Sequence, residues 1–302
     1  MSLPLDPQAD VEDDACPDTT LYDPRFLLPF LSQLLSPEMY MDKHMRLVDS
    51  GALSYAISSL SSREWGVRAA GYHVLAKVVT DMYTAKLAQE KQVWLHILSL
   101  VRNGLATNTN TSRCARLSSL VTVFLVRVVD ILLTPLSPLY KTVARSILAK
   151  PAMDLQAVPE FSRLFNSADL NSKAEQRWVL EMVRDGMRDN LDYSLANRSF
   201  VCKILQSQWA SVAIDRVGHL LVLDVLERCV ATNYGCKALM NRHGLLTWLV
   251  GVIRQDKVDK LYVKKVVIIV KIVMKTVLKI DQRKQDEKKG LLVQLILLDL
   301  LK

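Results

Sequence analysis

Six lysines in the C-terminal part of the chain are spaced as one face of a helix. If residues 257–280 are helical, all six lie within an arc of about 100°, because each residue turns an α-helix by about 100°. They are Lys257, Lys260, Lys264, Lys271, Lys275 and Lys279, which we call the lysine row. A line of ammonium groups opposite a Val/Ile face can neutralise RNA phosphates without reading the bases, or bind a phosphorylated protein. The alternative is that a lysine-rich amphipathic helix turns this face only to solvent.

The residues around the lysine row limit what it could recognise. Tyr262 is the only aromatic residue within 257–280, so the stacking of single-stranded bases is not favoured. Arg283, Lys284, Lys288 and Lys289 extend the positive charge and form a weak candidate for a nuclear localisation signal. We therefore expect contact with a phosphate backbone and not the reading of a base sequence.

Catalytic, cofactor and metal chemistry have no local motif in this chain. The sequence contains no glycine-rich phosphate loop, no HExxH and no GxSxG. The histidines and cysteines are scattered singly: His44, His73, His96, His219 and His243; Cys16, Cys114, Cys202, Cys229 and Cys236. We predict no catalytic, cofactor-binding or metal-binding residue, no cofactor and no small-molecule substrate, and we expect His73 to be a partly buried helix residue. An enzyme whose site brings distant residues together stays open as an alternative.

Composition favours a helical chain with a basic body. Half of the 302 residues are hydrophobic, whereas glycine and proline number only 10 each. Residues 1–20 carry six acids and no base, and we predict that they form a disordered acidic segment. Because the net charge of the whole chain is +8, residues 21–302 carry about +14, which favours RNA or an acidic protein surface as partner. No stretch is apolar enough for a membrane span, so no membrane partner is expected.

Helical periodicity is clearest after Ser61. Apolar residues recur at the spacing of one helix face, and small residues such as Gly71 would let a neighbouring helix approach closely. Ser61 with Glu64, and Ser172 with Glu175, have the spacing of capping boxes at helix starts. The β-branched run 266–270 is flanked by lysines at helical spacing, so we predict helix there as well.

Two segments resemble each other and indicate a repeat. The segments beginning at Ser50 and at His243 each contain a glycine, a short apolar helix, a polar turn and a second apolar helix. Such a unit must stack on neighbours to bury its apolar side. We predict an all-α, armadillo/HEAT-like helical repeat (an α-solenoid) with degenerate repeats over residues 21–302. The asparagines that follow tryptophans in importin-type grooves are absent, so we expect the five tryptophans to pack in the core or between repeats.

Several blocks resemble the C-terminal domain of the nucleolar pre-ribosomal-associated protein 1 family. The blocks are LYDPRFLLPFLSQLLSPE from Leu21, SGALSYAISSLSSREWGVRAAGYHVLAKV from Ser50, VRNG from Val101, KPAMDLQAVPEFSRLFNSADLNSKAEQRWVLEMVRDGMRDNLDY from Lys150 and HGLLTWL from His243. They follow family order over residues 21–250, while the basic helices expected in 251–302 match less clearly.

The resemblance implies a function in ribosome assembly. It implies a non-catalytic scaffold of the nucleus and nucleolus that supports large-subunit rRNA processing, with the pre-ribosomal particle (rRNA and assembly factors) as partner. An armadillo-like adaptor that binds only proteins outside ribosome assembly stays open. Members of the family are much longer, so we expect the face that would pack on their remaining repeats to be exposed here as a partner or aggregation surface.

Overall fold

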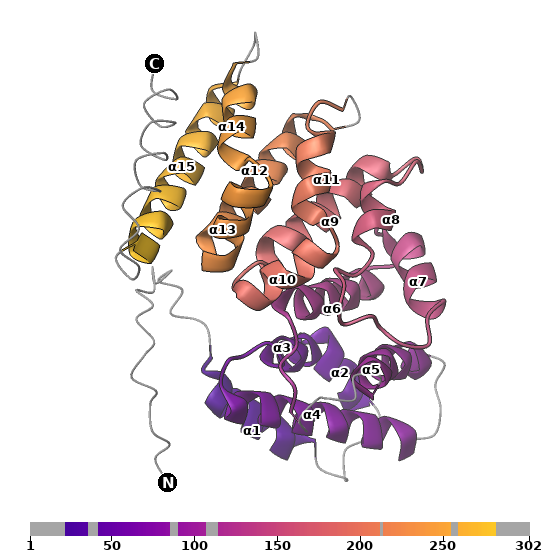
Figure 1. Cartoon of the computed structure of the whole chain (residues 1–302). Coiled ribbons are helices and arrows are strands. Elements are labelled where there is room, and N and C mark those ends of the chain that lie inside the picture. The colour runs from indigo at the N-terminus through magenta and orange to yellow at the C-terminus, as the bar shows by residue number, and fades with distance from the viewer. Residues whose placement is uncertain are drawn as a thin grey trace.

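The chain folds into helices stacked side by side (Figure 1). The computed structural model describes residues 22–35, 42–84, 90–106, 114–211, 214–254 and 259–281, and these residues contain fifteen α-helices and no strand. In chain order the helices are α1 (Pro24–Leu34), α2 (Asp42–Asp49), α3 (Ala52–Ser59), α4 (Trp65–Thr84), α5 (Glu90–Ala106), α6 (Ser119–Leu133), α7 (Tyr140–Leu148), α8 (Phe161–Phe165), α9 (Ser172–Gly186), α10 (Asn190–Arg198), α11 (Val201–Gln208), α12 (Arg216–Ala231), α13 (Asn233–Arg242), α14 (Leu245–Ile253) and α15 (Lys260–Asp281). The predicted all-α class is confirmed.

Every third helix from α3 onward packs against the next, and we call this series the central row. It runs α3, α6, α9, α12 and α15, as Figure 1 shows for its later members. The helices α9, α12 and α15 begin at residues 172, 216 and 260, so each starts 44 residues after the one before. That interval is typical of armadillo and HEAT units of roughly 40–47 residues. The helical-repeat solenoid is therefore confirmed, and its assignment to the armadillo or HEAT class stays a prediction.

Apolar side chains and glycines hold the central row at close range. Phe124 of α6 meets Trp178 of α9 edge to face, with 5.9 Å between ring centroids. A Cβ added at Gly186 of α9 would lie 2.8 Å from the Leu120 backbone of α6, so the two helices touch there. The close approach predicted at Gly71 is confirmed in the same way, because a Cβ there would collide with Ser59 of α3.

The two segments that resemble each other have the same local structure. Gly51 precedes α3 and Gly244 precedes α14, and both glycines have positive φ angles, 78° and 56°. No atom lies near a Cβ built at either position, so glycine serves the left-handed backbone and not a crowded contact. In each segment the next helix is a long one, α4 or α15, and residues 266–270 are helical as predicted.

Both predicted capping boxes are wrong. The Ser61 hydroxyl donates to the Ser58 carbonyl at the end of α3, and Ser62, not Ser61, accepts the Glu64 amide. Ser172 is the first residue inside α9, so it cannot cap that helix. The Glu175 carboxylate is buried and accepts a hydrogen bond from Thr142 of α7. Spacing alone did not reveal that the Glu175 carboxylate bonds to another helix.

A capping box that we did not predict joins the start of α10 to the start of α6. Asp189 and Asp192 cap the start of α10 reciprocally, and Asp192 also accepts hydrogen bonds from the Ser118 hydroxyl and the Ser119 amide at the start of α6. Burial raises the pKa of Asp192 despite the hydrogen bond from Ser118. Burial acts in the same direction on Asp189, but Arg116 donates to its carboxylate at 2.5 Å and lowers its pKa. The pair thus fixes the position of α10 against α6.

Two predicted side-chain environments need correction. Trp94, Trp178 and Trp209 are buried as expected and Trp248 is half-buried, but Trp65 at the start of α4 is exposed. His73 was expected to be partly buried, yet it lies on the exposed side of α4.

Some predictions fall outside the described residues. These are the acidic segment 1–20 and the basic cluster after residue 281. The predicted domain boundaries also stay predictions. Among the described helices, none is both long and apolar enough to cross a membrane.

Replacing Asp192 by alanine should destabilise the fold strongly. The change leaves buried donors at the starts of α6 and α10 without their acceptor, so we expect the free energy of unfolding to fall by about 3 kcal/mol. Chemical denaturation measures this loss. The matched control is Asp169→Ala, at an exposed carboxylate, which should change stability by less than about 0.5 kcal/mol. Equal stability of the two variants would contradict the role given to Asp192.

Candidate nucleic-acid interface

The helix that carries the lysine row is held against the central row by one apolar face. Val266, Ile269 and Val273 of α15 are at most 1% exposed and face the stack, where α15 packs on α12, α13 and α14. Their spacing of three and four residues is that of one helix face. The orientation of α15 about its axis is therefore determined by the core, and its opposite side is turned outward.

Four members of the lysine row lie on that outward side. They are Lys260, Lys264, Lys271 and Lys275, all exposed, and none makes an ion pair within the described part of the chain. Lys257 and the side chain of Lys279 lie outside the part of the chain that the structure describes. The predicted Val/Ile face is only partly correct, because Val267 and Ile268 are exposed between the lysines.

One lysine of α15 that is not in the row has a different role. The Lys265 ammonium contacts Asp224 at 2.6 Å and Glu227 at 3.1 Å, both on α12. The hydrogen bond to Asp224, with the Glu227 bond and the charge of both acids, raises the pKa of Lys265. Lys265 thus serves the contact between two helices, while its neighbour Lys264 points to solvent.

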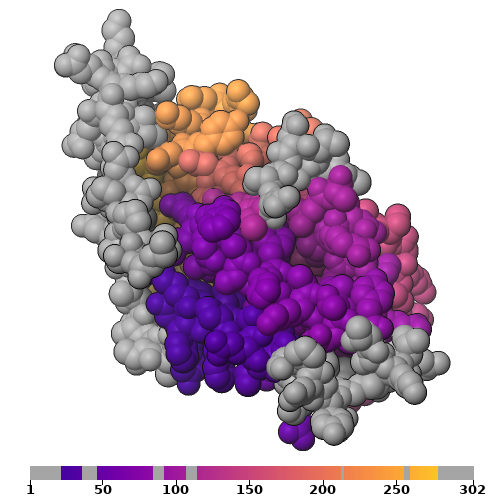
Figure 2. Space-filling view, turned by 90° about the horizontal axis from the view of Figure 1, so that it is seen from below, coloured from indigo at the N-terminus to yellow at the C-terminus, as the bar shows by residue number. Residues whose placement is uncertain are grey.

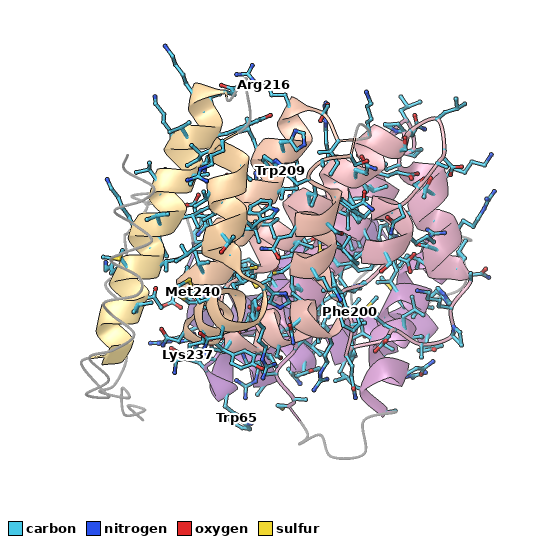
Figure 3. The ribbon with its side chains drawn as sticks, turned by 45° about the horizontal axis from the view of Figure 1, so that its top comes forward. Trp65, Phe200, Trp209, Arg216, Lys237 and Met240 are labelled. Carbon is cyan, nitrogen blue, oxygen red and sulfur yellow. The ribbon has the colours of Figure 1, made fainter. Side chains whose placement is uncertain are left out.

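The start of α15 is fixed by charged and aromatic contacts. The Asp259 carboxylate accepts the Leu261 amide at 3.0 Å and pairs with Arg216 of α12 at 2.5 Å, and these contacts lower its pKa. Behind this pair, Trp209 packs against His219, Trp248 and Tyr262, with ring centroids 4.4, 5.2 and 5.7 Å away. Figure 3 shows Trp209 and Arg216 near the end of the molecule where α15 begins. Tyr262 is therefore engaged in packing. This agrees with the expectation that it does not stack on nucleic-acid bases.

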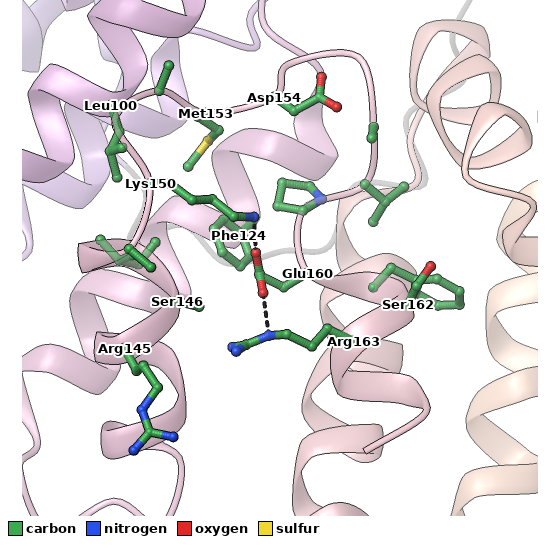
Figure 4. A pocket seen from close by; sticks show the side chains of 17 residues that line it. Leu100, Phe124, Arg145, Ser146, Lys150, Met153, Asp154, Glu160, Ser162 and Arg163 are labelled. Carbon is green, nitrogen blue, oxygen red and sulfur yellow. Dashed lines mark hydrogen bonds and ion pairs between the residues drawn. The ribbon is translucent and has the colours of Figure 1, made fainter. Parts of the chain in front are cut away.

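The described part of the chain also contains a recess of about 480 Å³ between α5, α6, α7 and α8 (Figure 4). Glu160 lies in it with a left-handed backbone, φ 56°, and its carboxylate pairs with Lys150 and with Arg163. Neither a histidine nor a cysteine is among the residues that line this recess. Both carboxylate oxygens of Glu160 are thus engaged by bases, and Asp154 is the other acid among the residues that line the recess.

Buried cysteines do not form a reactive centre either. The Cys202 and Cys229 sulfur atoms lie 3.6 Å apart inside the stack, and their hydrogen bond and burial raise the pKa of Cys229. Burial also raises the pKa of Cys236 to about 11. Since the thiolate is the nucleophile and the metal ligand, the raised pKa makes Cys229 and Cys236 poor nucleophiles and poor metal ligands. No group of His, Cys, Asp or Glu within the described ranges could hold a metal ion.

Comparison with known proteins assigns the chain to a family. The family model described as nucleolar pre-ribosomal-associated protein 1 matches residues 53–248. The chain belongs to the nucleolar pre-ribosomal-associated protein 1 family. It is 31% identical over 240 residues to the protein of that name from Mus musculus, and 30% identical over 233 residues to that from Homo sapiens.

The relatives are much longer than this chain. The matched regions cover 80% and 77% of the chain but only 10% of each relative, so the chain corresponds to about a tenth of their length. No solved structure matches the chain significantly. The matched residues 53–248 include α6, α9 and α12 of the central row and all but the first residue of α3, whereas α15 and its lysines lie beyond them.

Truncating Lys265 should weaken the attachment of α15. In Lys265→Ala, Asp224 and Glu227 lose their shared cation, and we expect the free energy of unfolding to fall by about 1 kcal/mol because the pair is partly exposed. Lys264→Ala is the matched control and should leave stability unchanged, because Lys264 faces solvent. Urea denaturation of both variants measures the difference. If Lys264→Ala were the more destabilised variant, the placement of the two lysines would be wrong.

Proposed function

We propose that this chain is a non-catalytic scaffold of ribosome biogenesis in the nucleus and nucleolus. The support is its membership of a family whose relatives are named as nucleolar and pre-ribosomal-associated. Its work is to hold components together by surface contact, and its partner is the pre-ribosomal particle, with rRNA and assembly factors. The finer role is in the processing of large-subunit rRNA.

The mechanism follows from the position of α15. The central row holds this helix rigidly, and its outward lysines meet the phosphate backbone of rRNA, where each neutralised phosphate releases counterions. Phosphate contacts position a partner without selecting a base sequence, which suits a scaffold. The exposed Val267 and Ile268 between the lysines add apolar contact area to the same surface.

The observation that carries this proposal is that neighbouring lysines of α15 have different surroundings. Lys265 is tied to two acids of α12, whereas Lys264, Lys271 and Lys275 are exposed and unpaired among the described residues. Cations that stabilised only the fold would have acids beside them. Those three lysines have none among the described residues, which leaves their charge available to a polyanion.

A second candidate function is favoured by where the lysines lie in the stack. They are on the side of α15 opposite α12, and a polar face of this kind is also typical of the hydrated outer surface of a solenoid. On this hypothesis the lysines only keep the face of α15 hydrated, and the chain is an adaptor that binds only proteins.

Co-sedimentation with pre-ribosomal particles tests the proposal. The tagged chain should sediment with large precursor particles, and the variant Lys264→Glu, Lys271→Glu, Lys275→Glu should be released from them at least tenfold more readily, because three phosphate contacts become repulsive. Raising the salt concentration should release the unmodified chain, with a slope of log affinity against log salt that is steeper by roughly 2–3 than that of the variant.

The control keeps the same change of charge at other positions. Lys141→Glu, Lys173→Glu, Lys203→Glu alters three exposed lysines on α7, α9 and α11 and should sediment like the unmodified chain. Co-sedimentation that survives in the α15 variant would favour the protein adaptor. If the unmodified chain and both variants stayed at the top of the gradient, a function in ribosome assembly would be excluded.

A further inference from the structure

An exposed phenylalanine with an unfavourable backbone conformation stands at the start of α11. Phe200 has a φ angle of 54° and is 63% exposed. A left-handed backbone disfavours a bulky side chain and is usually taken by glycine. Gly244 holds the same place at the start of α14, 44 residues later, which is also the interval between α9, α12 and α15. Glycine would therefore serve the fold equally well at position 200.

Glu160 has the same backbone conformation, but its side chain has partners within the molecule. Its carboxylate pairs with Lys150 and with Arg163. The Phe200 ring, in contrast, is not among the side chains that pack on the core of the described chain. Residues held in unfavourable conformations cluster at binding sites. A ring fixed in solvent in this way indicates contact with a partner.

The charges beside this ring are positive. Lys203, one turn along α11, and Arg242, at the end of α13, are exposed and make no ion pair within the described ranges. Burial lowers the pKa of His243, and so do the charges of Lys203 and Arg242, which places the three groups close together. The sequence contains no acid in 193–214 or in 228–255. A positive surface without acids is complementary to an acidic partner.

A recess of about 270 Å³ lies between α11 and α14. Trp209 and Trp248 line it, and the Trp248 indole donates to the Gln206 carbonyl at 3.2 Å, which joins the two helices. Lys203 and Gln206 are three residues apart and so lie on one face of α11. Figure 3 shows Phe200 and Trp209, which stand at opposite ends of that helix. The recess is mostly apolar and suits an apolar side chain of a partner.

These features favour a peptide over a nucleic acid. Phosphates could meet Lys203 and Arg242, but an RNA strand has no apolar side chain to fill the recess between the tryptophans. A peptide supplies carboxylates for the two bases and apolar side chains for the ring and the recess. The rise of the helix from Phe200 to Gln206 is about 9 Å, which an extended peptide covers in about three residues.

We propose that this surface of α11 and α14 binds an acidic peptide segment of a protein partner. One apolar side chain of the peptide packs on Phe200, a second one fills the recess, and carboxylates beside them pair with Lys203 and Arg242. The proposal rests on the scaffold function above and adds a surface for a protein to the lysines that meet rRNA. Figure 2 shows the face formed by the N-terminal helices, indigo to purple, and the orange part of the chain that includes α14 lies at its upper edge.

Selection from a library of random 12-residue peptides on the immobilised 302-residue chain tests this surface. The selected peptides should contain Asp or Glu together with two large apolar residues three or four positions apart. Fluorescein-labelled copies should bind in the micromolar range by fluorescence anisotropy, more weakly as salt is raised. A selection that yields no binding peptide, or only peptides without acids, would overturn the proposal.

Phe200→Gly separates binding from folding. Glycine takes a left-handed backbone freely, so the variant should keep the Tm of the unmodified chain, while its affinity for the selected peptides should fall about tenfold. Lys203→Glu, Arg242→Glu should weaken binding by a similar factor and reduce its salt dependence. The matched control is Tyr83→Ser, which removes a ring that is 61% exposed on α4 and should leave binding unchanged. Unchanged peptide binding in Phe200→Gly, or a lower Tm, would show that the ring serves no partner or serves the fold.

Two further measurements distinguish this surface from the RNA contact of α15. The α15 variant should bind the selected peptides like the unmodified chain, and Phe200→Gly should still sediment with pre-ribosomal particles. Failure of one proposal therefore leaves the other standing. If a fluorescein-labelled oligouridine displaced the peptides and lost affinity in Phe200→Gly, the surface would be a single-stranded RNA site and the peptide proposal would be wrong.

Discussion

Burial of a helix on two opposite sides is the constraint on which the rest of this structure depends. In α12, Leu223 and Val225 are both fully buried although their side chains leave the helix about 200° apart. This is possible only because α9 covers one side of α12 and α15 covers the other. No helix of the central row could bury its apolar surface alone, so each depends on the next. Apolar packing brings these helices together. Ion pairs at the edges of the contacts then help to fix their positions along one another, as Arg127 does with Asp185 and Arg177 does with Asp215.

This constraint explains why the two ends of the described stack differ. At one end α15 is apolar toward α12 and basic toward solvent. At the other end α1 is apolar on both sides, and one of those sides has no covering helix within the described residues. The chain therefore has two chemically distinct surfaces for contact. The recess between α5, α6, α7 and α8 contains a carboxylate that is paired with two bases.

Local features of the fold could be predicted from the sequence because they depend on neighbouring residues. The helical period after Ser61, the close approach at Gly71 and the helix through residues 266–270 all follow from side-chain size and spacing. Contacts between distant segments could not be predicted in this way. Glu175 has the spacing of a capping residue but bonds to Thr142, 33 positions away, and Asp192 links α10 to α6 across 74 positions.

At the candidate interface, too, features within one helix could be predicted from the sequence, whereas contacts between helices could not. Helical spacing predicted which lysines share a face, and four of the six are described there and exposed. Spacing could not predict that Lys265 is neutralised by Asp224 and Glu227, because those acids belong to another helix of the row. Nor could it predict that Trp65 is exposed, since a tryptophan in an amphipathic pattern is usually buried.

Hydrogen exchange of the chain with and without Leu223→Ala tests the stacking most directly. The substitution opens a cavity in the middle of the row and should cost about 2–5 kcal/mol. If the helices depend on one another, the backbone amides of α9, α12 and α15 should all lose protection by a similar free energy, because they open together. If only the amides of α12 exchanged faster while α9 and α15 kept their protection, the row would be a set of independent helices, which would contradict their mutual dependence.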